Sequence, residues 1–115
     1  MEKRFTNKVV VVTGATKGIG LACAERLKNE GAIVCAIQRG HSSLFDTFEF
    51  DLSKEQDCSM SIDTIIKKYG RIDVLINNAG IMKESSVLDT SLEEWNQTLA
   101  VNLTAPFLLT KFCMP

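Results

Sequence analysis

The sequence predicts an α/β fold in which a parallel sheet carries helices on both faces. Short runs of apolar residues, several of them β-branched, alternate along the chain with longer segments of helical period. The first run, residues 9–12, is valine at every position, as in a strand that is buried on both faces. Strands that alternate with helices lie parallel and are joined by right-handed crossovers. A doubly wound sheet is therefore the predicted architecture.

The first half of the chain contains three predicted strands and one predicted helix. The helix follows a glycine-rich turn, carries apolar residues at helical spacing, and ends at Gly31. A polar loop without helical period separates the second strand from the third. The predicted bounds are 9–12 for the first strand, 32–37 for the second, 40–47 for the polar loop and 48–50 for the third strand.

Two capping boxes mark the helices of the second half. Ser53 with Gln56 opens a helix that Gly70 ends. Ser91 with Glu94 opens the last helix, whose apolar pattern continues to the end of the chain. The bounds expected between these two helices are 72–76 for a fourth strand and 82–90 for a loop.

These elements predict an incomplete Rossmann-type fold of four parallel strands with flanking helices. The helical pattern is still running at Pro115, so we expect the chain to end within the fold. Residues 1–115 are then the N-terminal portion of one dinucleotide-binding domain. The far edge of the fourth strand would lie open, which favours pairing with another chain.

Composition excludes several classes of partner. The 115 residues are 45% apolar and carry a formal net charge of −1, which gives no electrostatic footprint for nucleic acid or an acidic membrane surface. No apolar run approaches the ~20 residues that a membrane span needs. The N-terminal residues MEKRFTNK do not resemble a secretory signal. We expect neither a nucleic-acid partner nor a membrane span.

The cysteines and the single histidine do not form a metal-binding pattern. No two cysteines have C-x-x-C spacing, and His41 is the only histidine. Most of the cysteines fall in apolar stripes of the predicted helices or strands, which is typical of free thiols in a reducing compartment. We therefore expect no metal site and a cytoplasmic location. The four are Cys23, Cys35, Cys58 and Cys113.

The glycine-rich turn TGATKGIG, from Thr13 to Gly20, joins the first strand to the first helix. Glycine tolerates positive φ and lets the backbone approach a ligand, so such a turn can present N–H groups at a helix N-terminus. An anionic pyrophosphate would fit there. Ordinary strand-to-helix connections can share this pattern, so it does not define a site by itself.

Two cations accompany the turn. Lys17 lies within it, and Arg39 lies at the tip of the second strand, which in a dinucleotide site faces the adenosine ribose. An acid there would hold a free 2′-hydroxyl, but this chain has Gln38 and Arg39 instead. The two cations would attract a 2′-phosphate, which favours NADP(H) over NAD(H). The alternative is that both are ordinary solvated surface residues.

The third and fourth strands end on polar residues. The Asp51 carboxylate could accept a hydrogen bond from the adenine amino group, with Leu52 packed on the ring; alternatively, Asp51 only begins the cap of the next helix. Asn77 and Asn78 end an otherwise apolar strand at the edge where ligands bind in open α/β sheets. Their amides need hydrogen-bond partners in the protein, in a ligand, or in both.

Asn102 interrupts the apolar stripe of the last helix, where an apolar side chain would be expected. Burying an amide without partners costs about 1–3 kcal/mol. Pro106 lacks the N–H that would bond to the carbonyl of Asn102, so the helix should bend there. That free carbonyl could hold a water in a proton relay. The alternative is that a buried Asn102 bonds across to the loop after the fourth strand.

Taken together, these positions resemble the N-terminal half of the classical short-chain dehydrogenase/reductase family, including the 3-oxoacyl-carrier-protein reductase type. The resemblance covers the whole chain and rests on four motifs in order: TGATKGIG, DLS (51–53), NNAG (77–80) and VNLTAPF (101–107). It implies reversible hydride transfer between nicotinamide and an alcohol or carbonyl. It also implies that Asn102 belongs to the catalytic tetrad. The implied cofactor-binding residues are Gly14, Thr16, Lys17, Gly18, Ile19, Gly20, Arg39, Asp51, Leu52, Asn78, Ala79 and Gly80.

The chain departs from the family pattern in two places. The segment between Arg39 and Phe48 is too short and polar for the helix that many members carry there. The Ser and the Tyr-x-x-x-Lys of the family are absent: Tyr69 is the only tyrosine, and Asp73 stands four residues after it. The general acid is therefore missing, and we expect these 115 residues alone to be inactive.

Three functions remain open at this stage. The chain is the cofactor-binding half of an NADP(H)-dependent oxidoreductase acting on small alcohols or carbonyls, or a dinucleotide-binding module without catalysis. Alternatively, it is a half-fold whose open edge pairs with another chain. For the enzyme we expect a homo-oligomer.

Overall fold

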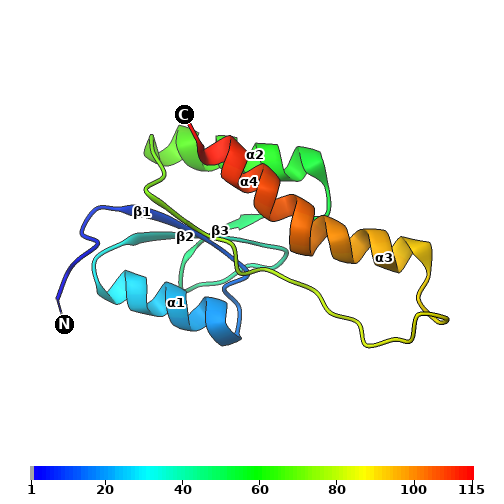
Figure 1. Cartoon of the computed structure of the whole chain (residues 1–115). Helices are drawn as coiled ribbons and strands as arrows, with labels where there is room; N and C mark the ends of the chain where they lie inside the picture. Colours follow the sequence, from blue (N-terminus) through cyan, green and yellow to red (C-terminus); the bar gives the residue numbers. More distant parts are fainter. Residues whose placement is uncertain (1) are drawn as a thin grey trace.

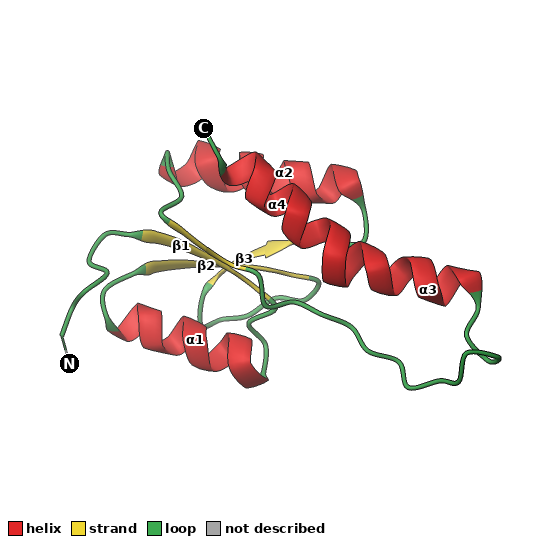
Figure 2. Ribbon diagram, in the orientation of Figure 1, coloured by secondary structure: helices red, strands yellow, loops and turns green. Residues whose placement is uncertain are grey.

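The computed structural model describes residues 2–115. Four parallel strands form one sheet in the order β3-β2-β1-β4. Helix α1 lies on one face, and helices α2 and α4 lie on the other (Figures 1 and 2). The predicted Rossmann-type doubly wound fold is confirmed. The strands are β1 (Val9–Thr13), β2 (Ile33–Gln38), β3 (Asp46–Glu49) and β4 (Val74–Ile76), and the helices are α1 (Gly18–Asn29), α2 (Glu55–Tyr69), α3 (Leu92–Leu99), the π-helix η1 (Ala100–Thr104) and α4 (Ala105–Cys113).

The valines of β1 divide between two cores, because alternate side chains of a strand point to opposite faces of the sheet. Val9 and Val11 pack with α2 and α4, in the core that contains Ile62 and Leu109. Val10 and Val12 pack on the α1 side. All four valines are at most 2% exposed, so β1 is the buried centre of the fold.

The α1 side is closed without an additional helix. Residues 39–45, all within the described part of the chain, form no helix, as the short polar segment predicted. The ring of Phe45 is buried in the α1-side core, and the Lys28 ammonium lies 5.7 Å from its centroid. Lys28 Nζ also donates to Leu44 O at 2.7 Å. A single aromatic side chain thus covers this part of the core.

Helix α1 ends as its glycine predicted, and its last carboxylate is tied to the N-terminal segment. Gly31 follows the helix with φ of +96°. The buried Glu30 carboxylate accepts hydrogen bonds from Arg4 and from Arg26. The bonds from Arg4 and then Arg26 lower the pKa of Glu30 to about 2. Glu30 therefore remains ionised and joins two segments of the chain.

The edge strands differ from their predicted bounds because acidic side chains hold their ends. β3 begins at Asp46, whose Oδ2 accepts from Tyr69 Oη at 2.5 Å and from Lys68 Nζ at 2.7 Å. β4 begins only at Val74. The residue before it, Asp73, accepts from Val9 N at 2.8 Å through its side chain. A hydrophobicity pattern does not register these polar anchors.

One capping box is correct and the other is wrong. Ser91 is the N-cap of α3, and its hydroxyl accepts from Glu94 N at 3.1 Å. Ser53 does not cap α2: its hydroxyl donates to Asp51 Oδ1 at 2.7 Å, and the N-cap position falls to Lys54. A hydrogen bond to an ionised carboxylate is charge-assisted and therefore strong. The Ser53 hydroxyl is accordingly bonded to Asp51 and not to the start of α2.

The last predicted helix is interrupted by one π-helical turn. In η1 the N–H of Ala105 bonds to the carbonyl of Ala100, five residues earlier. This wider turn directly precedes Pro106, which has no N–H to continue the regular ladder. The backbone irregularity predicted near Asn102 is therefore present as a π-helix. On the N-terminal side of this turn, α3 projects past the sheet (Figure 1).

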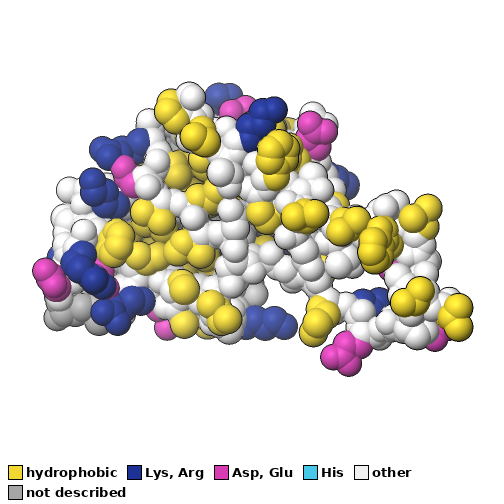
Figure 3. Space-filling view, viewed as in Figure 1, with side chains coloured by type: hydrophobic (Ala, Val, Ile, Leu, Met, Phe, Trp, Pro, Cys, Tyr) yellow, Lys and Arg dark blue, Asp and Glu magenta, His cyan; other side chains and the backbone are white. Residues whose placement is uncertain are grey.

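The side of the molecule formed by β4, α3 and α4 is the least covered. Within residues 2–115, no strand pairs with the far edge of β4. Leu108 and Leu109 are buried, but Leu103 and Phe107 are 66% and 64% exposed. Apolar side chains gather over α3 and the adjacent loop in the space-filling view (Figure 3). Among the described residues, no helix combines the length and the apolarity needed to cross a membrane.

Candidate dinucleotide site

The turn between β1 and α1 can be built only with glycine at its critical positions. Gly14 and Gly18 have φ of +72° and +61°. A Cβ atom on Gly20 would lie 1.9 Å from Gly14 O and 2.3 Å from Asn78 Nδ2. The backbone of α1 therefore starts in direct contact with the end of β1 and with the segment after β4. Between these points, residues 16–19 are exposed.

Thr13 and Asn78 lock this turn to the end of β4, in an arrangement that we call the Thr13–Asn78 clasp. Thr13 Oγ1 accepts from Asn78 N at 3.0 Å and from Ala79 N at 2.9 Å, and it donates to Ile76 O at 3.5 Å. Asn78 Nδ2 donates to Thr13 O at 3.2 Å and to Gly14 O at 2.9 Å. The Asn78 side chain thus has a structural role, one of the two roles considered for the pair.

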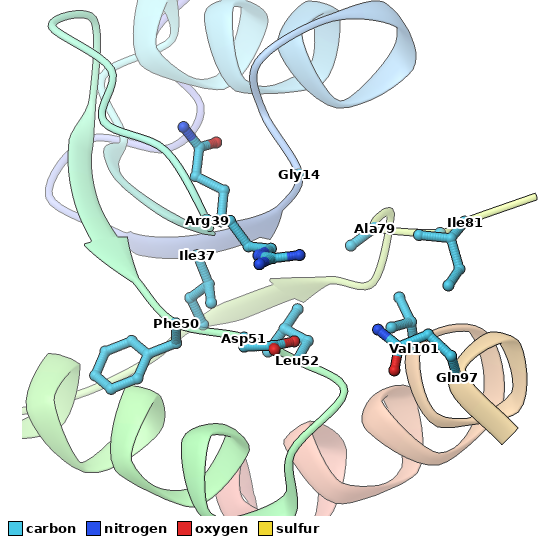
Figure 4. Close-up of a pocket in the computed structure, with 12 residues that line it drawn as sticks. Gly14, Ile37, Arg39, Phe50, Asp51, Leu52, Ala79, Ile81, Gln97 and Val101 are labelled. Atoms are coloured by element: carbon cyan, nitrogen blue, oxygen red, sulfur yellow. The ribbon is translucent and has the colours of Figure 1, made fainter. Parts of the chain in front are cut away.

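A cavity of about 170 Å³ lies beside the clasp, at the carboxyl ends of the strands. Figure 4 shows Arg39 on one side and Asp51 with Leu52 opposite, while Ala79, Ile81, Gln97 and Val101 border the far side. Open α/β sheets bind ligands at this edge. The lining residues are Gly14, Ile37, Gln38, Arg39, Phe50, Asp51, Leu52, Ala79, Gly80, Ile81, Gln97 and Val101.

The Asp51 carboxylate is ionised and keeps one oxygen free. Its Oδ1 accepts from Ser53 Oγ at 2.7 Å and from Ser53 N at 3.0 Å. These bonds, first the hydroxyl and then the N–H, lower the pKa of Asp51, and the Arg39 charge acts in the same direction. No group within residues 2–115 donates a hydrogen bond to Asp51 Oδ2. Asp51, which lines the cavity, therefore keeps an unused acceptor.

Arg39 and Lys17 occupy different surroundings. The Arg39 side chain lines the cavity and forms no salt bridge within the described residues. Lys17 is the exposed N-cap of α1 and is not part of the cavity wall. The two cations named from the sequence are thus separated: one belongs to the cavity and the other to the start of the helix.

Asn102 clasps the chain that follows β4. Its Oδ1 accepts from Ile81 N at 2.8 Å, and its Nδ2 donates to Ile81 O at 2.7 Å. The expectation that Asn102 is buried is wrong, since this residue of the π-helix is exposed. The alternative that it bonds across to the loop after the fourth strand is confirmed. Asn77, by contrast, reaches α4, with its Nδ2 3.4 Å from Thr110 Oγ1.

The sequence-derived site residues fall into two groups. Six of them line the cavity: Gly14, Arg39, Asp51, Leu52, Ala79 and Gly80. The others lie along the turn, beneath it or on the π-helix: Thr16, Lys17, Gly18, Ile19, Gly20, Asn78 and Asn102. The prediction missed six lining residues: Ile37, Gln38, Phe50, Ile81, Gln97 and Val101. Most of these are immediate neighbours of predicted residues. Identifying them would have required knowing which side chains of each strand and helix point toward the cavity.

The donor set fits a phosphorylated adenosine group better than a metal ion. Apolar walls surround one free carboxylate oxygen and one unpaired guanidinium, next to a turn that has no room for a Cβ at Gly20. Among residues 2–115, no group of three or more His, Cys, Asp or Glu side chains could hold a metal ion. All four cysteines are free thiols, and burial raises the pKa of Cys35 to about 12.

The fold defines a Rossmann-type α/β protein, and comparison with known proteins gives its family. The short chain dehydrogenase family model matches residues 8–115, and the chain belongs to that family. It is 37% identical to meso-2,3-butanediol dehydrogenase of Serratia marcescens, a match that covers 97% of this chain and 49% of the relative. The chain therefore spans about half the length of such relatives.

Solved structures agree with this assignment. The ligand-free aldohexose dehydrogenase of Thermoplasma acidophilum superposes with a TM-score of 0.90 at 37% identity, over 98% of this chain and 45% of that one. A metagenomic short-chain oxidoreductase in complex with NADP gives a TM-score of 0.88 at 32% identity, over 94% of this chain and 55% of that one.

We predict that Gly20→Ala destabilises the fold by about 2 kcal/mol or more, because the new methyl group overlaps Gly14 O and the Asn78 amide. Gly40→Ala is the matched control, since a Cβ there would meet nothing within 4 Å. Thermal melts of both variants test this. A Gly20→Ala variant as stable as Gly40→Ala would contradict the close contact.

Proposed function

We propose that this chain is the cofactor-binding half of an NADP(H)-dependent oxidoreductase that interconverts a small alcohol and its carbonyl compound. The observation that carries the proposal is the cavity beside the glycine turn, which is lined both by Asp51, with its free carboxylate oxygen, and by Arg39, with its unpaired guanidinium. Bound NADP(H) would supply the hydride. A similar protein has been crystallised with NADP, which supports this choice of cofactor.

Each end of the adenosine group would find a matching residue. Asp51 Oδ2 accepts from the adenine amino group, and Leu52 packs against the ring. Arg39 pairs with the 2′-phosphate, since guanidinium and phosphate form strong charge-assisted bonds. The pyrophosphate lies along the exposed residues 16–19, at the N-terminus of α1, where backbone N–H groups and the helix dipole favour an anion.

The reacting groups of the complete enzyme are only partly present in these residues. We propose that Asn102 belongs to the catalytic group, as the family resemblance implies, and that its bonds to Ile81 fix the chain beside the nicotinamide. The 115 residues contain neither Tyr-x-x-x-Lys nor a substitute at Tyr69, which is bonded to Asp46. They would therefore provide binding and positioning without the general acid.

We predict that the chain binds NADP⁺ more tightly than NAD⁺ and that Arg39→Gln removes this preference. Losing one charge-assisted contact to a phosphate should weaken NADP⁺ binding about tenfold or more and leave NAD⁺ binding nearly unchanged. Lys67→Gln makes the same charge change on α2 and serves as the control. Isothermal titration with both dinucleotides measures the ratio.

An NAD⁺ preference, or an Arg39→Gln variant with the wild-type ratio, would contradict the assignment of Arg39. The same samples can be mixed with NADPH and small ketones. No oxidation of NADPH is expected, because general acid catalysis typically contributes about 10²–10⁴-fold to such rates. Steady turnover would mean that the acid lies within these residues.

We also propose that the protein is a cytoplasmic homo-oligomer and that one of its interfaces lies on α3 and α4. Exposed apolar side chains recur every three or four residues along α3, η1 and α4. A contiguous apolar face of this kind is typical of a surface that packs against another chain. A second copy presents the same face, as a two-fold dimer requires. The side chains are Leu92, Trp95, Leu99, Leu103 and Phe107.

We predict that the chain dimerises at micromolar concentration and that Leu103→Glu shifts it to monomer, because a charge would be desolvated in the apolar contact. Met60→Glu, on the exposed side of α2, is the control and should leave the dimer intact. Light scattering across a concentration series decides the matter. A stable monomer at every concentration would exclude this interface, and with it the reading of the chain as a self-associating module.

A further inference from the structure

Gln38 is the last residue of β2, and its amide side chain is buried. From the sequence, this position was notable only because it carries no acid. The residue is 7% exposed. Its Oε1 accepts from Ala15 N at 3.0 Å, and its Nε2 donates to Gly40 O at 2.9 Å. Both ends of the amide are therefore engaged inside the protein.

The two partners allow only one orientation of the amide. A backbone N–H can only donate and a backbone carbonyl can only accept, so Oε1 must face Ala15 and Nε2 must face Gly40. A glutamate at this position would retain the bond to Ala15 but would set an oxygen against the Gly40 carbonyl. A methionine of similar length would lose both bonds. The position therefore discriminates between side chains of similar length.

The amide joins the two loops that flank the cavity. Ala15 belongs to the glycine turn and is 1% exposed, whereas Gly40 directly follows Arg39. Packing does not hold Gly40 in place, because a Cβ there would meet nothing within 4 Å. The next anchor of this loop is Ser42, whose N–H donates to Thr47 Oγ1 at 3.1 Å. The exposed residues 39–41 are thus held between the Gln38 bond and the Ser42 bond.

We propose that Gln38 is a positioning residue for cofactor choice: its amide fixes the Arg39 loop relative to the glycine turn. The amide thereby fixes the distance between Arg39, which binds the 2′-phosphate, and the glycine turn, which binds the pyrophosphate. This inference rests on the proposed function, since it concerns how the chain favours NADP(H). A purely structural amide would affect the melting temperature, or both dinucleotides equally, but not the ratio of their affinities.

Gln38→Met tests the proposal by isothermal titration with NADP⁺ and NAD⁺. We expect the ratio of the two affinities to fall about fivefold or more, because Arg39 would no longer be held where the 2′-phosphate binds. Gln38→Leu should lower the ratio as well, because it also removes both bonds and adds no charge beside the 2′-phosphate. Gln56→Met, on the exposed side of α2, is the matched control. Melting curves establish that each variant is folded, and Gln38→Leu carries the test if Gln38→Met is not.

A double-mutant cycle separates positioning from a general effect. In an Arg39→Gln background, Gln38→Met should change the affinity ratio no further, because the group that it positions is gone. Additive effects, or a folded Gln38 variant with the wild-type ratio, would overturn the proposal while the proposed function stands. A wild-type chain that binds neither dinucleotide would overturn the proposed function, and this inference with it.

Discussion

The geometry of the site depends on one buried hydroxyl. Thr13 is 2% exposed, and its Oγ1 is bonded to two N–H groups and one carbonyl from the end of β4. Asn78 completes the clasp from the other side by donating to Thr13 and Gly14. A buried polar group that loses its partners costs about 1–3 kcal/mol. The clasp thus fixes where β1 ends and where α1 begins, and only glycine at position 20 leaves room for both.

The charged residues divide into those that hold the fold and those that remain free. Glu30, Asp46 and Asp73 each anchor an element end through hydrogen bonds to arginine, lysine, tyrosine or backbone groups. Asp51 uses only one carboxylate oxygen within the protein, and Arg39 forms no salt bridge with the described residues. Both of these incompletely used groups line the same cavity. This contrast is the strongest physical argument for a ligand there, because binding can satisfy charges that folding left available.

The sequence predicted the structure correctly where a residue type strongly favours one local conformation or one role. The all-valine strand, the positive-φ glycines and the Ser91 cap were predicted correctly, and so were the polar strand ends that line the cavity. It failed where a side chain could choose between partners. Ser53 bonds to Asp51 instead of capping α2. For Gln38, which bonds to Ala15 and Gly40, the sequence indicated no partner at all. Asn102 is exposed on a π-helical turn and bonds to Ile81, which the helical period did not indicate. Local hydrogen bonds compete on nearly equal terms, and periodicity carries no information about them.

We expect these residues to form, by themselves, the site for the phosphorylated adenosine end of the cofactor. An amide NMR titration with 2′,5′-ADP tests it most directly, because each backbone N–H reports on its own surroundings. The largest shifts are expected in the glycine turn 14–20, at Arg39 and Gly40, at Asp51 and Leu52, and at Ala79 and Gly80. Shifts confined to α3 and α4, or no shifts at saturating ligand, would rule out this placement of the cofactor.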